Sequence, residues 1–184
     1  DATPKVIGDP NPDFNLGLRN SVRYRFATLS FFLDYRSGFD IANAPRLQMV
    51  FNGVAEETAN RGEMVVFDGV KKSDGSVNNI QATASQSWYR QTFNNPGMYV
   101  EKDLYWLRLR DINLSFELPQ KWIEKARIAR ASITFTGRNF LLKTNYTGSD
   151  PDLGSRNGLS NGVGVDFWTT PNTRSYATTL TVTF

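Results

Sequence analysis

The feature that most limits the possible folds is a strict alternation of side-chain character, seen clearly in the last stretch, SYATTLTVTF. Successive side chains of a β-strand point to opposite sides, so alternate residues share a face. One face here is apolar or aromatic, at Tyr176, Leu180, Val182 and Phe184. The other is small or hydroxyl-bearing, at Ala177, Thr179, Thr181 and Thr183. The pattern predicts a strand with one apolar and one polar side.

Four earlier segments alternate in the same way and predict further strands at 14–25, 28–36, 103–119 and 131–144. Only a very short turn around Phe26 and Ala27 separates the first two, which favours an antiparallel hairpin. In the third segment the alternation changes phase near Arg110, so we expect a β-bulge there. The predicted fold class is all-β and antiparallel. Its apolar face includes Leu16, Leu18, Val22, Leu29, Phe31, Leu33, Ile112, Leu114 and Phe116.

Two long connections, 37–102 and 145–173, separate these strands, and such connections usually carry function. In the first, apolar residues from Ile41 to Val54 recur at helical spacing, with Pro45 suited to a first turn. The remainder predicts ordered loop. Its aromatic side chains either stack on sugar rings or pin the loop to itself, and both readings stay open. They are Trp88, Tyr89, Phe93 and Tyr99.

Composition excludes several classes of function. The 184 residues contain no cysteine and no histidine, which removes thiolate and imidazole metal sites and histidine-based catalysis. The net charge of +3 is small and its cations are spread along the chain, unlike the basic patch of a nucleic-acid-binding protein. Asp150 and Asp152 suggest a calcium loop, but the spacing then leaves the EF-hand pattern, so a turn is favoured. We predict no enzyme activity, cofactor or metal.

The alternating strands fit either a soluble sheet or a membrane wall. Short links alternate with long ones, and the strands are long enough to cross a bilayer when they are tilted, as in transmembrane barrels. Charges gather on the polar faces, where a wet lumen would accommodate them, at Arg19, Arg23, Arg25, Asp34, Arg36, Asp111 and Glu117. The alternative is a soluble β-sandwich that binds carbohydrate through its aromatic residues. Since five strands cannot close a barrel, the membrane interpretation requires a longer protein, and the loop-like opening residues predict a fragment.

The chain resembles the C-terminal end of SusC/RagA-like TonB-dependent outer-membrane transporters. The similar stretches occur in the family's order and cover nearly the whole chain. They are IGDPNPDFNLGLRNSVRYR (7–25), LSFFLDYRSGFDIAN (29–43), FNGVAEETANR (51–61), LRLRDINLSFELPQKW (107–122), ITFTGRNFLLKTNYTGSDPD (133–152) and TTLTVTF (178–184). Two stretches depart from the family's usual pattern. Arg138 and Phe140 stand where the family more often has an uncharged residue and leucine, and TTPNTRSY replaces a more usual aromatic–proline lead into the last strand.

The resemblance implies that residues 1–184 are the C-terminal portion of a transporter barrel, with the plug and N-terminal domains absent from this chain. They would supply about the last five strands of a 22-stranded barrel in the Gram-negative outer membrane, with long extracellular loops. The implied activity is TonB-dependent import of oligosaccharides or peptides together with a SusD-like surface lipoprotein. A further possibility is a barrel fragment captured as a client or component of a larger envelope complex.

The resemblance also implies roles for particular residues. Tyr176, Leu180, Val182 and Phe184 would form the C-terminal signal read by the barrel-assembly machinery, and the loop aromatics become candidates for contact with the lipoprotein lid. Tyr105 and Trp106 are predicted in the aromatic girdle at the membrane interface. The lumenal arginines either bind anionic substrate or pair with Asp34, Asp111 and Glu117, and we favour pairing.

Overall fold

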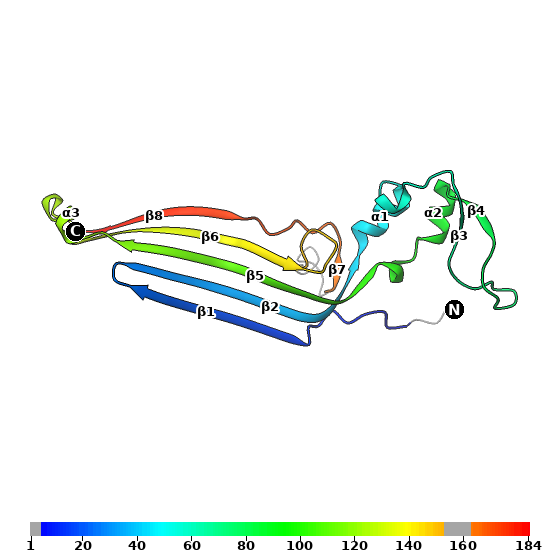
Figure 1. The fold of residues 1–184 in the computed structure, drawn as a ribbon, viewed down its shortest axis with the longest axis horizontal. Coiled ribbons are helices and arrows are strands. Elements are labelled where there is room, and N and C mark those ends of the chain that lie inside the picture. Colours follow the sequence, from blue (N-terminus) through cyan, green and yellow to red (C-terminus); the bar gives the residue numbers. More distant parts are fainter. Residues whose placement is uncertain (1–4, 153–162) are drawn as a thin grey trace.

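The protein is built on one antiparallel sheet of long strands, drawn out into a single layer (Figure 1). The computed structural model describes residues 5–152 and 163–184. The strand order is β1-β2-β5-β6-β8, and the short β7 pairs in parallel with the far end of β2. The long strands are β1 (Phe14–Tyr24), β2 (Ala27–Asn43), β5 (Val100–Glu117), β6 (Arg130–Thr144) and β8 (Ser175–Thr183), and β7 is Val165–Asp166. The sheet is open, with β1 and β8 at its edges.

The predicted hairpin and bulge are both confirmed. Tyr24 pairs with Ala27, so β1 and β2 are joined by a two-residue turn in which Arg25 has a positive φ of 52°. The register of β5 shifts between Leu109 and Asp111 against both of its neighbours. Because Arg110 is the extra residue, the apolar side chains on either side of it stay on one face of the sheet.

The second strand is longer than its alternation predicts. The segment expected at 28–36 continues as β2 to Asn43, through Gly38 at a φ of +73° and two register shifts against β5. These irregularities break the period-two pattern that marks a strand in the sequence. Ile41, expected on a helix, therefore lies in β2, where it is buried.

The first long connection folds into a small body at one end of the sheet (Figure 1). The predicted helix is confirmed as α1 (Ala44–Asn52), which has Pro45 in its first turn, is capped by the Asn43 side chain and ends at Gly53 in the left-handed conformation. The expectation of loop for the remainder is wrong in part. It also contains η1 (Glu56–Thr58), β3 (Met64–Val66), β4 (Gln81–Thr83), α2 (Gln86–Thr92) and η2 (Pro96–Tyr99).

The opposite end of the sheet carries only short links. The β5–β6 link forms a short helical turn, α3 (Gln120–Ile123), followed by η3 (Glu124–Ala126). The second long connection includes β7, which sequence reasoning missed, while residues 153–162 lie outside the described residues. None of the helices in the described ranges is long and apolar enough to span a bilayer.

Most of the buried apolar residues gather at the loop end and not between two layers, while Ile123 and Ala131 are buried at the opposite end. One cluster joins Phe39 and Ile41 of β2, Leu104 and Trp106 of β5, and Tyr146 just after β6. A second holds the loop body together and consists of Val50, Ala84, Tyr89 and Tyr99. The long middle of the sheet has no such cluster among the described residues. Stability is therefore concentrated where the loops meet the sheet.

Replacing Trp106 by alanine tests that conclusion. Trp106 is 2% exposed, so Trp106→Ala is expected to cost about 3–5 kcal/mol through lost burial and an internal cavity. The thermal midpoint of the longer protein containing this chain, measured in detergent, should fall. The matched control Trp168→Ala removes an exposed indole and should leave that midpoint unchanged. Equal effects of the two substitutions would contradict the assignment of Trp106 to a core.

Candidate functional site on the two faces of the sheet

The apolar face is continuous across the strands. Cross-strand register pairs Leu18 with Leu33, Phe31 with Ile112, and Leu114 with both Leu29 and Phe135. Ile133 pairs with Leu180 at the other edge. From Leu107 to Phe116, the β5 side chains that register assigns to this face are Leu107, Leu109, Ile112, Leu114 and Phe116. The band they form carries no charge along this strand.

No second layer in the described residues covers this apolar face. Leu16 is 51% exposed, Leu18 47% and Val22 58%, values far above those of a protein core. Leu180, Tyr176 and Phe184 are likewise exposed, while Phe31, Leu33, Ile112, Phe116 and Val182 are half-buried. A soluble protein rarely leaves so large a patch uncovered without a partner. What covers the face, and hence the predicted lipid contact of these residues, stays a prediction.

The polar face is a ladder of paired groups, and the predicted pairing is confirmed for Arg19 and Arg23, whereas Arg25 and Arg36 stack on the rings of Tyr24 and Trp106. Arg23 donates to Glu117 at 2.7 Å, and Arg19 lies 3.9 Å from Asp111. Between them hydroxyl and amide groups continue the ladder, with the Thr134 hydroxyl donating to Ser115 at 2.9 Å and that of Thr136 to Asn113 at 2.7 Å. The Arg23–Glu117 and Arg19–Asp111 pairs are largely exposed to solvent, so each contributes little to stability. Their arrangement suits a wet surface.

Towards the loop end, the polar face carries a partly buried ionic cluster. Arg110 donates to Asp34 at 2.9 and 2.5 Å and to Asp152 at 2.6 Å, so it bridges β2 to the segment after β6. Arg108 pairs with Asp150, and both side chains are almost fully buried. The backbone and side-chain N–H groups of Asn172 also donate to Asp150, at 3.1 and 3.2 Å. Asp150 and Asp152, expected in a turn, therefore anchor that turn to the sheet by pairing with Arg108 and Arg110.

The predicted place of Trp106 in an aromatic girdle is wrong. Trp106 is opposite Arg36 in register, and the Arg36 guanidinium lies 4.5 Å from the centroid of its ring. Phe39 meets the same indole edge-on at 5.2 Å between centroids. Trp106 thus lies on the polar side of the sheet, where residues at the loop end cover it. Its neighbour Tyr105 has the opposite parity and pairs with Ser37 on the apolar side.

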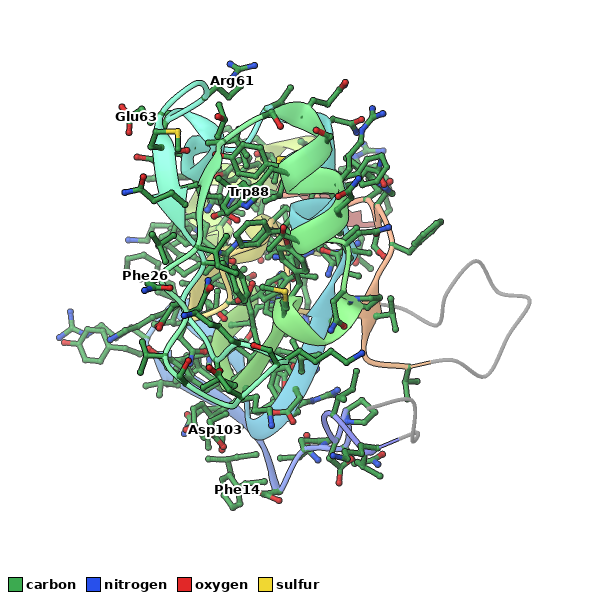
Figure 2. The ribbon with its side chains drawn as sticks, turned by 90° about the vertical axis from the view of Figure 1, so that its right-hand side faces the viewer. Phe14, Phe26, Arg61, Glu63, Trp88 and Asp103 are labelled. Atoms are coloured by element: carbon green, nitrogen blue, oxygen red, sulfur yellow. The ribbon has the colours of Figure 1, made fainter. Side chains whose placement is uncertain are left out.

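The four candidate aromatics of the long loop come together, but largely with one another. Tyr89 and Tyr99 are buried in the loop's own cluster, and Trp88 and Phe93 pack against it. The rings of Trp88 and Phe93 lie 5.0 Å apart, and Tyr89 also bonds to Asn60. Burial raises the pKa of the Tyr89 and Tyr99 hydroxyls, as expected for groups removed from water. Figure 2 shows Trp88 inside the loop body and Arg61 at its rim. The geometry favours pinning of the loop over ligand contact.

A groove that sequence reasoning missed opens beside α1. It has a volume of about 900 Å³ and lies between that helix and residues 147–149 and 166–171. Met49, Val54 and Trp168 give it an apolar lining, and Arg46 pairs with Glu57 in its wall at 2.9 Å. Trp168 has a positive φ of 60°, an uncommon conformation for a bulky residue. No local motif links these segments, so only the fold brings them together.

Fold and faces together define an all-β protein whose main sheet has one uncovered apolar side and one ion-paired polar side. No protein-family model matches the chain. Over its whole length it is 27% identical to 17% of TonB-dependent receptor P3 of Formosa agariphila. Over 97% of its length it is 26% identical to 18% of TonB-dependent receptor P26 from the same organism. The chain thus spans less than a fifth of the curated relatives it matches.

Solved structures give the same result at the level of fold. The structure of the RagAB peptide transporter aligns with 94% of this chain at a TM-score of 0.58 and 19% identity, using 17% of the transporter chain. The RagAB peptide importer in the open-open state aligns with 95%, also at 0.58. These comparisons confirm the predicted resemblance to the C-terminal part of a SusC/RagA-like TonB-dependent outer-membrane transporter.

The buried Arg108–Asp150 pair gives a direct test of the ionic cluster. Arg108→Met leaves a buried carboxylate without its cation, which is expected to destabilise the loop end by roughly 3–5 kcal/mol. The double variant Arg108→Met/Asp150→Leu removes both charges and should recover most of that loss. Thermal melting of the longer protein measures both. Arg23→Gln, in the exposed pair with Glu117, is the control and should cost about 0–1 kcal/mol. A double variant no better than Arg108→Met would overturn the pairing account.

Proposed function

We propose that this chain is the C-terminal wall of the β-barrel of a TonB-dependent importer in the Gram-negative outer membrane. It would supply about the last five strands of a 22-stranded barrel, while the plug and N-terminal domains belong to parts of the protein outside these 184 residues. The observation that carries the proposal is the uncovered apolar face, backed by a paired polar face on the same strands. In a bilayer the first face meets hydrocarbon, and the second borders a water-filled interior.

The loop lengths support one orientation. The end with the α1–α2 body and the groove would be extracellular, and the end with the short β1–β2 and β5–β6 links would be periplasmic, as in bacterial barrels. Apolar-face residues such as Leu16, Leu29 and Leu114 then face lipid. Charge on such a face is costly at mid-membrane, which explains its absence from the middle of β5.

The printed descriptions of the relatives support a proposal for the substrates and partners. The receptors from Formosa agariphila are named TonB-dependent, and the solved relatives are described as a peptide transporter or importer. We therefore propose import of peptides or oligosaccharides, energised through the TonB complex and assisted by a SusD-like surface lipoprotein. The groove between α1 and residues 166–171, together with the α1–α2 body, is the surface that this chain offers to such a partner or substrate. The role is transport, without catalysis or a cofactor.

Two other functions are compared with these observations, and the first fits them less well. A soluble β-sandwich needs a second layer over Leu16, Leu18 and Val22, and the described residues supply none. Its proposed sugar-binding aromatics, Tyr89 and Tyr99, are buried in the loop. A barrel fragment held in a larger envelope complex would keep the same two faces, and it differs from the importer only in what surrounds the sheet.

A charge placed on either face of β1 distinguishes membrane from soluble folding. Leu18 lies near the middle of β1 on the apolar face, and Ser21 lies on the polar face of the same strand, opposite Ser30. In the longer protein, Leu18→Arg is expected to cost about 2–4 kcal/mol at mid-membrane and to lower the amount assembled in the outer membrane. Ser21→Arg should leave it unchanged. Heat-modifiable migration of outer-membrane fractions measures assembly. Normal assembly of Leu18→Arg would contradict lipid contact.

The proposed assembly signal predicts a position-specific effect at the end of β8. Phe184 is exposed beside the apolar face, and Val182 and Leu180 precede it at alternate positions. Deleting Phe184 is expected to slow insertion by the barrel-assembly machinery and to leave unassembled protein in the periplasm. Thr183→Ala changes the neighbouring polar position and should not do so. Pulse-chase recovery of the heat-modifiable form distinguishes the two. Identical kinetics for the deletion and the parent would remove the signal role.

A further inference from the structure

The β5–β6 link at the proposed periplasmic end concentrates the positive charge of the molecule. Residues 119–130 carry four cationic side chains and a single carboxylate, Glu124. Their net charge of +3 equals the formal net charge of the whole 184-residue chain. Lys121, Lys125 and Arg127 are exposed and form no ion pair among the described residues. A concentrated positive charge of this kind attracts a negatively charged partner.

The short helix in this link has an inward and an outward side. Gln120 and Ile123 line a cavity of about 570 Å³ against the polar face of the sheet, and Ile123 is 6% exposed. Arg130 lines the same cavity and belongs to the inward side. Trp122 does not line it and is 74% exposed. The outward side therefore combines a bare indole with the three unpaired cations.

Other exposed aromatic residues share this end of the sheet. The Glu117 backbone N–H donates to the carbonyl of Phe26 at 2.8 Å, which brings the β1–β2 turn beside the start of the link. The Ala129 N–H donates to the carbonyl of Thr183 at 2.7 Å, which brings the adjoining Phe184 close to the end of the link. Tyr24, Phe26 and Phe184 are all exposed there, and Arg25 stacks over the Tyr24 ring at 5.3 Å. Aromatic rings beside cations are typical of a protein surface at the level of lipid headgroups.

We propose that the outward side of residues 119–130 binds the phosphate headgroups of anionic phospholipids in the periplasmic leaflet. Lys121, Lys125 and Arg127 supply the charge that attracts phosphate, and Trp122 inserts at the boundary between headgroups and hydrocarbon. The charge favours a lipid over a neutral protein surface, and the indole favours a membrane boundary over free phosphate. The inference rests on the proposed function, since it requires the neighbouring apolar face to lie in a bilayer.

Lipid selectivity of the longer protein that contains this chain tests the proposal. Native mass spectrometry after incubation with equal amounts of phosphatidylglycerol and phosphatidylethanolamine gives the ratio of the two lipids bound. The parent should prefer phosphatidylglycerol, and Lys121→Gln/Lys125→Gln/Arg127→Gln should reduce that preference by at least about five-fold. Trp122→Ala should lower retention of both lipids without changing their ratio. The matched control is Arg61→Gln/Lys71→Gln/Lys72→Gln, which removes three cations from the opposite end and should leave the ratio unchanged.

The contrary outcomes separate this inference from the proposed function. An unchanged lipid ratio in the link variant overturns the headgroup site. An unchanged ratio with a lower thermal midpoint in lipid-free detergent also overturns it, and assigns the cations to contact with another part of the protein. In both cases a protein that still fractionates with the outer membrane keeps the importer proposal. A protein that is monodisperse without detergent and absent from membranes contradicts the importer proposal itself.

Discussion

The alternation of side chains along a β-strand is the constraint on which the rest of this structure depends. A sheet one layer thick presents both of its faces to the surroundings, so each face must suit a different environment. Leu18, Phe31 and Leu114 make one face apolar, while Arg19, Asp111 and Glu117 make the other polar. In the described structure the first face is uncovered, while the second carries ion pairs. The two faces therefore favour different surroundings, one apolar and one aqueous.

The ionic cluster shows how such a sheet supports loops. A single layer offers no core on which a long connection can settle, so the attachment must come from the polar face itself. Arg108 and Arg110 extend from the wall, and Asp150 and Asp152 extend from the connection after β6. Burying these charges is favourable only because each has an opposite partner and further hydrogen bonds, including those from Asn172. Trp106 and Tyr146 add apolar contact on the same side.

Much of the sheet was predictable from the sequence, because regular strands have a local period. The hairpin at 14–36, the bulge at Arg110 and the helix at Pro45 all have signals within a few residues. The extension of β2 was not predictable, since a left-handed Gly38 and two register shifts erase the period. The helix α2 was missed because it is short and its sequence, QSWYRQT, is mostly polar.

The Arg108–Asp150 pair joins residues 42 apart, and no local pattern encodes that contact. The groove beside α1 was missed for the same reason, since its walls come from separate connections. Alternation also explains the failure of the prediction for Trp106. Tyr105 and Trp106 look equally suited to an interface, but adjacent residues cannot share a face, so at most one of them fits there.

The two edges of the sheet argue further for the proposed surroundings. Each edge strand has a row of backbone N–H and C=O groups that no other described strand pairs, on β1 beyond β2 and on β8 beyond β6. Water can satisfy such groups, but hydrocarbon cannot, and each unpaired group in lipid costs several kcal/mol. If the apolar face meets lipid, both edges must be paired with other strands. Relatives of which this chain matches only 17% or 18% have the length to provide those strands. The apolar face and the open edges therefore support the same proposal, a closed barrel to which this sheet contributes one part of the wall.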